Sequence, residues 1–182
     1  MTTVRWLDDE EQEAWRAFVF ATQMLHDVLD RQLAGEAGMP HSYYMILAML
    51  SEAPRRSLSM GEVAELTRSS LSKVSHAMPK LEARGWVRRD RHWRDARVVV
   101  ATLTDDGLAA LKDAAPGHVE QVRRALFDRL DREQVRHLRD IFRTVLAGLG
   151  SDEGNAPAGL RARSARPPGA RKAPTRQGMA GK

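Results

Sequence analysis

The segment RRDRHWRDARVVVATLT, residues 88–104, concentrates basic side chains on a short stretch of chain. Its first ten positions contain five arginines, a histidine and a tryptophan, and three valines follow. Arginines on a narrow turn suit the minor groove of a duplex, because its negative potential attracts inserted guanidinium groups. The valines are typical of a β-strand that would anchor the turn. The segment therefore indicates binding of a polyanion.

The net charge of +5 is unevenly distributed along the chain. Residues 68–97 contain nine lysines and arginines against three acids, whereas residues 1–33 contain seven acids against three bases. Residues 151–182 contain seven bases against two acids, which leaves residues 1–150 without net charge. A neutral body with one basic strip indicates a localised polyanion site rather than a generally adhesive surface.

Composition and spacing argue against several other kinds of chemistry. The chain contains no cysteine, which excludes disulfides, thiolate metal sites and thiol chemistry. Its six histidines show no His-x-x-x-His spacing, so no metal and no cofactor is expected. Ser70 and Lys73 match the Ser-x-x-Lys motif of penicillin-binding enzymes, but the Ser-Asp-Asn and Lys-Thr-Gly partner motifs are absent. No catalytic residue is assigned, and we expect a protein that is not an enzyme.

The first residues, MTTVRWLDDEEQ, are acidic and lack the basic-then-apolar order of a signal peptide. No apolar run approaches the roughly 18 residues that a membrane span needs. We therefore expect a cytoplasmic protein without a membrane partner.

Two short helices and a hairpin are predicted in the middle of the chain. Ser59-Met60-Gly61-Glu62 has the Ser-x-x-Glu form of a capping box, which predicts a helix start. After a break at 67–69, a second helix is predicted over 70–84, and two strands over 86–91 and 98–103 follow it. Two short helices joined by a tight turn form a helix-turn-helix. The strands would make the basic segment between them a wing.

Longer helices are predicted on both sides of this unit. Apolar positions recur at helical spacing in four further segments, residues 7–33, 40–50, 104–130 and 131–149. Pro116-Gly117 is expected to bend or interrupt the third of them. Small and basic residues predominate over 151–182, which predicts a disordered basic tail.

One face of the predicted helix over 70–84 could read a duplex. It combines small hydroxyls, amines and an imidazole, which can approach base edges and phosphates in a major groove. These residues are Ser72, Lys73, Ser75, His76 and Lys80. Ser69 and Ser70 lie at the amino end, where free N–H groups favour a phosphate. Pro79 removes the N–H that would bond to the Ser75 carbonyl and is expected to kink the helix.

The wing supplies a second set of basic groups, which we expect to project to one side: Arg91, His92, Arg94 and Arg97. A helix in the major groove and an arginine-bearing arm in the minor groove together predict double-stranded DNA as the partner.

The segments SMGEVAELTRSSLSKVSHAMPK and LEARGWVRRDRHWRDARVVVATLTDDG resemble the MarR family of bacterial winged-helix transcription regulators. The matching positions are Leu81-Glu82, Arg84-Gly85, Asp95-Ala96-Arg97, Leu103-Thr104 and Gly107. The flanks WLDDEEQEAWRAF and GMPHSYYMILAMLSEAP resemble the leading helices of an actinobacterial-type branch. The resemblance covers about residues 5–148.

The resemblance implies a mainly α fold with a small β-wing, in which dimerisation helices flank a winged helix-turn-helix domain. It implies four regions: an N-terminal dimerisation helix over 1–38, a DNA-binding domain over 39–103, C-terminal dimerisation helices over 104–150, and the tail over 151–182. Arg97 takes the place of the wing arginine that enters the minor groove, and Asp95 would orient it.

The resemblance also implies a homodimer, each winged unit reading half of a palindromic operator, and we expect a repressor. Candidate interface residues are Trp6, Leu126, Leu130, Leu138, Ile141, Phe142 and Val145. Many members release DNA when a small phenolic or anionic molecule binds, so an aromatic or anionic effector is expected. Trp15, His41, Tyr43 and Tyr44 are candidates for its pocket, although core packing is the commoner role of aromatics at helical spacing.

Two other functions fit part of the pattern. An architectural DNA-binding protein could act through its basic tail and be indifferent to sequence. A protein-interaction module could keep the fold without binding DNA. Truncation at Ser151 separates the regulator from the architectural protein, because only the regulator would keep its sequence preference.

Overall fold

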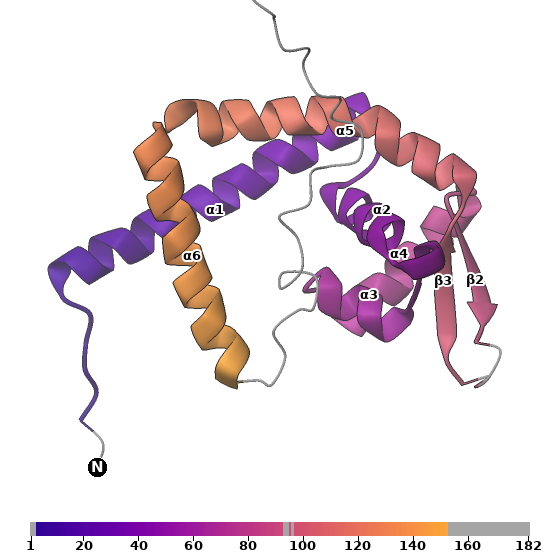
Figure 1. Ribbon diagram of the computed structural model, residues 1–182, viewed down its shortest axis with the longest axis horizontal. Coiled ribbons are helices and arrows are strands. Elements are labelled where there is room, and N and C mark those ends of the chain that lie inside the picture. Colours follow the sequence, from indigo (N-terminus) through magenta and orange to yellow (C-terminus); the bar gives the residue numbers. More distant parts are fainter. Residues whose placement is uncertain (1–2, 93–94, 96, 153–182) are drawn as a thin grey trace, which may run out of the picture. The chain divides into compact units, whose positions relative to one another are not determined.

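The computed structural model describes residues 3–92, 95 and 97–152. Over this part of the chain the helices are α1 (Asp9–Glu36), α2 (His41–Glu52), α3 (Met60–Leu66), α4 (Leu71–Ala83), α5 (Asp105–Ala125) and α6 (Arg132–Asp152) (Figure 1). The strands are β1 (Ser57–Ser59), β2 (Val87–Arg91) and β3 (Val99–Leu103), and two 3-10 turns cover Pro54–Arg56 and Phe127–Arg129. The predicted mainly helical fold with a small β-wing is confirmed. Residues 1–143 form one compact unit, and a second begins at Thr144, within α6.

The strands form one antiparallel sheet in the order β1-β3-β2. In the hairpin, Val87 pairs with Leu103 and Arg91 pairs with Val99. The His92 N–H donates to the Val98 carbonyl at 2.8 Å and continues the ladder toward the tip. Figure 1 shows the hairpin at the edge of this unit, away from α1. The sheet therefore presents the basic wing and ties its base to the helices.

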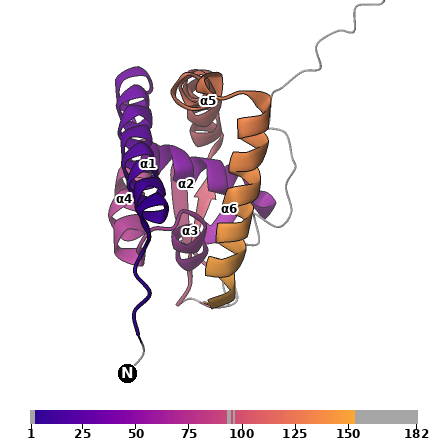
Figure 2. The ribbon, with the colours of Figure 1, turned by 90° about the vertical axis from the view of Figure 1, so that its left-hand side faces the viewer.

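We call residues 41–103 the winged lobe, because α2, α3, α4 and the sheet share one core. Its central side chains are fully buried: Leu47, Leu50, Val63, Met78 and Leu81. Figure 2 shows α2 in the middle of the packing, with α5 on one side and α3 on the other. Burial of several large aliphatic side chains stabilises the lobe by the hydrophobic effect, so the position of α4 is fixed within one chain.

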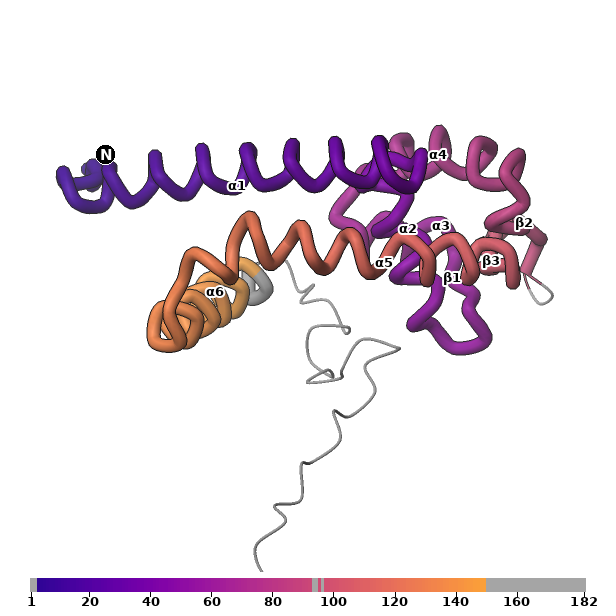
Figure 3. Tube along the Cα trace, turned by 90° about the horizontal axis from the view of Figure 1, so that it is seen from above, coloured from indigo at the N-terminus to yellow at the C-terminus, as the bar shows by residue number. Residues whose placement is uncertain are grey.

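Helices α1 and α5 run side by side (Figure 3). Within the 28 residues of α1, only Leu29 and Leu33 are buried, and both lie near its carboxyl end. Large apolar side chains nearer the amino end are exposed, including Trp15, Phe18 and Phe20. The apolar side chains of the amino-terminal half of α1 are therefore largely uncovered by the rest of the described chain.

Side-chain caps start α3 and α6 where the sequence predicts. Ser59 and Glu62 form the predicted capping box of α3, since each side chain bonds to the other residue's backbone N–H. The Asp131 carboxylate accepts from the Gln134 N–H at 2.8 Å, and the Gln134 side chain accepts from the Asp131 N–H. These bonds satisfy N–H groups that the first helical turn leaves without intrahelical partners.

Several predicted boundaries are wrong. Strand β1 is absent from the prediction, because three residues are too few for the alternation of Ser57, Leu58 and Ser59 to indicate a strand, and the strand is held by pairing with distant β3. Helix α1 continues through Gly35 to Glu36. Helix α5 continues through Pro116 but ends at Ala125, so Leu126 and Leu130 lie outside it. Lys112, whose carbonyl would face the missing Pro116 N–H, is exposed, and water can therefore satisfy that carbonyl.

None of the helices among the described residues has the length and apolar character needed to cross a membrane.

Candidate nucleic-acid interface

Helix α4 buries one face and exposes the other. Val74, Ala77, Met78 and Leu81 face the core of the lobe. The predicted DNA-contacting side chains on the helix are all exposed: Ser72, Lys73, Ser75, His76 and Lys80. Pro79 lies in the helix interior, and α4 is nevertheless assigned as one helix through it. The structure therefore brings the predicted reading residues together on one accessible surface.

The amino end of α4 is shaped by its two serines. The Ser70 hydroxyl accepts from the Lys73 N–H at 3.2 Å and caps the helix. Ser69 is half-buried, and its N–H donates to the Ala64 carbonyl at 2.9 Å. The first-turn N–H groups of a helix end carry partial positive charge. Ser70 thus fixes where this end points, beside the exposed Ser72.

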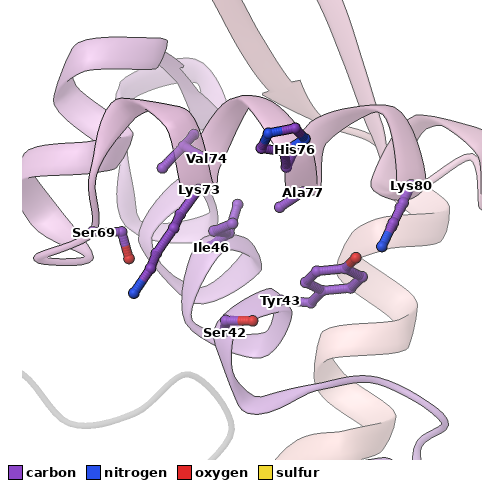
Figure 4. A pocket seen from close by; sticks show the side chains of 9 residues that line it. All are labelled: Ser42, Tyr43, Ile46, Ser69, Lys73, Val74, His76, Ala77 and Lys80. Atoms are coloured by element: carbon purple, nitrogen blue, oxygen red, sulfur yellow. The ribbon is translucent and has the colours of Figure 1, made fainter.

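A cavity of about 290 Å³ lies between α4 and the first turns of α2 (Figure 4). Figure 4 shows Lys73 extending from α4 so that its amine lies below Ser69, and Lys80 extending toward the hydroxyl of Tyr43. The full lining is Ser42, Tyr43, Ile46, Ser69, Lys73, Val74, His76, Ala77 and Lys80. Two amines and several hydroxyls around one hollow make it suitable for an anionic group.

Ser42 is the residue in this surface that the sequence reading missed. It lies in the first turn of α2, about thirty residues before α4 in sequence, and only the packing of the two helices brings it to the cavity. A serine after Pro40 is an ordinary helix-start residue, so no pattern in the sequence distinguishes it.

Glu82 and Arg89 connect α4 to the wing. The Glu82 carboxylate accepts from the Arg89 backbone N–H at 3.0 Å and from its side-chain Nε at 2.7 Å. The hydrogen bond from Arg89 holds the pKa of Glu82 below its usual range. Arg84 is also engaged, since its guanidinium lies 4.7 Å from the centre of the Trp86 ring and donates to the Gly38 carbonyl. Arg84 and Arg89, two cations of the basic strip, therefore make contacts within the fold.

Two glycines allow the close packing at the base of the wing. Gly85 has φ +69°, a left-handed conformation that favours glycine, directly after α4. A Cβ on Gly107 would collide with the carbonyl oxygen of Trp86. Thr104 completes the arrangement, because its hydroxyl donates to the Gly85 carbonyl at 2.6 Å and accepts from the Gly107 N–H at 3.0 Å.

At the wing, Asp95 holds Arg97. The carboxylate accepts from the Arg97 backbone N–H at 3.0 Å, from Nε at 3.1 Å and from the second guanidinium nitrogen at 3.2 Å. These bonds lower the pKa of Asp95. The Arg97 side chain remains 91% exposed. The arginine is therefore oriented by its neighbour but free to contact a ligand.

The other predicted wing residues are placed differently. Arg91 ends β2 and is exposed. His92 is half-buried and lines a hollow between the wing and β1. Arg94 lies outside the described residues, as does most of the basic tail, residues 153–182.

The four residues predicted for an effector pocket do not line a single described cavity. Tyr43 lines the cavity beside α4. His41 and Tyr44 contact His118 of α5, with ring centres 5.5 and 4.4 Å from the His118 ring. Trp15 is 56% exposed and contacts Phe18 at 6.1 Å between ring centres. It lies 11 residues before His26 on α1, about 16 Å along the helix.

The predicted interface residues differ in exposure. Trp6 and Ile141 are mainly exposed, with 83% and 58% of their surface accessible. Phe142 is half-buried and contacts Phe18 of α1 at 5.9 Å between ring centres. Leu126, Leu130 and Leu138 are half-buried. Val145, in the unit that begins at Thr144, is exposed.

No group of three or more His, Cys, Asp or Glu residues within residues 3–92, 95 and 97–152 could hold a metal ion.

Comparison with known proteins agrees with this geometry. A model of the MarR family matches residues 37–98, which cover α2, α3, α4 and the first strand of the hairpin. The chain is 25% identical over 139 residues to the transcriptional repressor YetL of Bacillus subtilis, covering 75% of this chain and 83% of that protein.

Two solved structures of Streptomyces coelicolor proteins are similar over most of the chain. Sco3205, a MarR family transcriptional regulator solved in complex with DNA, is 49% identical, with a TM-score of 0.77, over 81% of this chain and 92% of that one. AbsC, another MarR family transcriptional regulator, is 33% identical, with a TM-score of 0.74, over 81% of this chain and 99% of that one.

Proposed function

Because this chain belongs to the MarR family of DNA-binding transcriptional regulators, we propose that it is a repressor that binds a palindromic operator as a homodimer. The observation that carries the proposal is the shared placement, on one lobe, of the exposed hydroxyl and amine face of α4 and the oriented, exposed Arg97. The family model covers both parts of this surface, since residues 37–98 include α4 and Arg97.

The two parts of this surface suit adjacent grooves. In the proposed complex α4 enters the major groove, where Ser72, Ser75 and His76 approach base edges and Lys73 contacts phosphate. Arg97 enters the neighbouring minor groove, where guanidinium is attracted by the negative potential. Asp95 reduces the conformational freedom that Arg97 must lose, because the bonds that hold the guanidinium already exist.

A second copy of the chain is the proposed cover for the exposed apolar residues of the flanking helices. Phe18 on α1 and Ile141 on α6 are 43% and 58% exposed. Helices with apolar faces must bury them, and a two-fold dimer would present two winged lobes to the two halves of a palindrome. We propose residues 1–38 and 104–150 as the dimerisation parts around the DNA-binding domain, residues 39–103, with 151–182 as a basic tail.

The repressor role is supported by the similarity to YetL, which is named as a repressor. A small aromatic or anionic effector is also part of the proposal. The cavity beside α4 would suit it, because an anion held between Lys73 and Lys80 would occupy the amines that otherwise face DNA.

The test is selection of DNA from a random pool by the purified full chain, followed by titration on the selected site. We expect an enriched inverted repeat and an affinity that falls steeply with salt, with a log–log slope of about 0.9 for each phosphate neutralised. A variant truncated at Ser151 should select the same repeat. A chain that enriches no sequence, or loses its preference on truncation, would instead be an architectural DNA-binding protein.

The effector part is tested separately with benzoate as the probe. We expect benzoate to weaken binding to the selected site in the parent. It should have less effect on Tyr43→Ala, which alters the cavity without removing a charge. Equal inhibition of both proteins would place the effector site elsewhere.

A further inference from the structure

Three histidines from three helices meet where the flanking helices contact the winged lobe. His26 lies on α1, His41 on α2 and His118 on α5, and each pair of these helices is in contact. The ring centres of His26 and His41 are 5.3 Å apart, and those of His41 and His118 are 5.5 Å apart. We call these residues the histidine cluster. Tyr44 packs on its α5 side, 4.4 Å from His118.

The cluster contains a polar atom without a partner. Nδ1 of His118 is buried and makes no hydrogen bond. An unsatisfied buried nitrogen costs free energy, and a protonated ring in the same place would cost more because a charge is harder to bury than a dipole. The packing at this joint is therefore built for neutral rings.

Few charges near the cluster would offset protonation. On α1, Asp30 accepts the His41 backbone N–H at 2.8 Å, and Glu36 lies against Gly117, next to His118. Glu36 already accepts from the Gln32 side chain at 2.8 Å. On α2, Tyr44 packs on His118 and is neutral when protonated. On α5, Asp113 lines the same hollow as Glu36 and Gly117. Asp30, Glu36 and Asp113 are thus the nearby carboxylates that could offset a proton on the half-buried His41 or His118, and Glu36 is already engaged by Gln32.

The pKa shifts of the cluster residues also favour neutral rings. Burial, followed by repulsion from His26, lowers the pKa of His41, and Asp30 only partly opposes this. Burial, followed by repulsion from His41, lowers the pKa of His118. Burial also raises the pKa of the Tyr44 hydroxyl, so its ring remains neutral.

We propose that the histidine cluster is a proton-responsive joint: acidification loosens the packing of α1 and α5 on α2 and thereby weakens DNA binding. The effect on DNA rests on the proposed function. Its mechanism is that α2 belongs to the winged lobe, whereas α1 and α5 belong to the proposed dimer, so this joint sets the spacing between the two lobes. A palindromic site tolerates only a narrow range of that spacing.

The direction follows from linkage. A histidine whose pKa is lowered by packing stabilises the packed state fully above its ordinary pKa of about 6.5. That contribution is lost as the pH falls through the lowered value. Acid therefore favours the loosened joint. Protonation of the exposed His76 on α4 would act in the opposite direction, because a new cation facing DNA strengthens binding.

The experiment compares the full-length parent with the double variant His41→Gln/His118→Gln and with the control His137→Gln. His137 is exposed on α6, next to Glu133 and outside the cluster. Thermal unfolding and NMR titration of the histidine ring protons are measured between pH 7.5 and 5.5 without DNA. Affinity for the selected site is measured over the same range at constant salt.

In the parent and the control, we expect two histidine rings to titrate below the ordinary range. The thermal unfolding midpoint should decrease as the pH is lowered, and DNA binding should become weaker in acid. The equilibrium constant for packing of the joint should fall by up to about tenfold for each unit by which packing lowers the pKa of one histidine. The loss of DNA affinity should approach the same factor. The double variant should keep its unfolding midpoint and bind DNA equally or more tightly in acid.

The proposal would be overturned if all histidines of the parent titrated in the ordinary range. It would also be overturned if the parent and the double variant had identical pH profiles of unfolding and DNA affinity. A double variant that fails to fold at pH 7.5 leaves the parent's ring titrations as the deciding measurement. If the parent binds no selected DNA at pH 7.5, the proposed function fails, whereas the titration and unfolding data still decide whether the cluster senses protons.

Discussion

The winged lobe and the helices that flank it differ in how much of their apolar surface is buried within one chain. In the lobe, Leu47, Met78 and Leu81 are fully buried by residues of the same chain. On the flanking helices, Trp15 and Ile141 leave more than half of their surface exposed. The lobe therefore has its core within one copy, whereas the flanking helices leave apolar surface that the proposed second copy would cover. The proposed DNA-contacting part would then be rigid, while the spacing between two lobes would depend on assembly.

Loss of a buried side chain in the winged lobe should have the greatest effect on the free energy of unfolding. Met78→Ala should lower the free energy of unfolding by about 2–5 kcal/mol, because it removes a fully buried side chain and leaves a cavity. Urea denaturation at a fixed protein concentration measures it. Leu71→Ala, on the same helix but 54% exposed, is the matched control and should cost far less. Equal losses would mean that the lobe core is not where stability resides.

A charge on the flanking helices should separate the copies without unfolding the lobe. Ile141→Asp places a carboxylate in the proposed interface and should weaken dimerisation by at least about 2 kcal/mol. Light scattering at micromolar concentration should show a monomer with unchanged lobe stability. Glu65→Lys, a charge change at an exposed position of α3 outside the proposed dimerisation parts, should leave the dimer intact. A parent protein that is itself monomeric would remove the distinction between the two regions.

Arg97→Ala should affect the lobe's function but neither its stability nor the dimer. We expect operator binding to weaken by about 1–3 kcal/mol and the salt slope to fall by about 1, because one minor-groove cation is lost. Gel-shift titration at several salt concentrations measures both. Lys112→Ala removes an exposed cation on α5 that is not among the proposed DNA-contacting residues, and it should leave both values unchanged. Parent-like binding by Arg97→Ala would be incompatible with the proposed role of the wing.

Pro79→Ala should stabilise the winged lobe. Alanine restores the N–H that can donate to the Ser75 carbonyl and should add about 1 kcal/mol, less than the cost of about 3 kcal/mol for proline in a regular helix. Denaturation reports the gain. A loss of stability would show that the surrounding packing has adapted to the proline.

The smallest effect concerns the bond between α4 and the wing. The Glu82 pKa is lowered by Arg89, so the bond stabilises the fold above the ordinary carboxyl pKa and is lost as the pH falls through the lowered value. Glu82→Gln should therefore flatten the acid end of the stability profile, by less than about 1 kcal/mol for a half-buried pair. Identical acid profiles would mean that this carboxyl does not contribute.

Local signals explain what the sequence could predict. The capping boxes at Ser59 and Asp131 mark helix starts, because the chemistry of a cap lies within four residues. The exposed face of α4 follows from helical spacing alone. The family pattern of Glu82, Gly85, Thr104 and Gly107 is now seen as the set of contacts that hold the wing base against α4 and α5.

Contacts between distant segments explain what it could not predict. Strand β1 exists because it pairs with β3, more than forty residues away. Ser42 joins the α4 cavity, and His26, His41 and His118 form a cluster, only because separate helices pack together. The continuation of α5 through Pro116 depends on the exposure of the helix there, which local spacing does not give. The predicted DNA, effector and interface residues stay predictions.

The most direct test of simultaneous binding in two grooves is dimethyl sulfate protection on the selected operator, because this reagent methylates guanine N7 in the major groove and adenine N3 in the minor groove. With the parent we expect protection at both kinds of position in each half-site. Arg97→Ala should lose only the minor-groove protection. Protection confined to one groove in the parent, or an unchanged pattern in Arg97→Ala, would contradict this expectation.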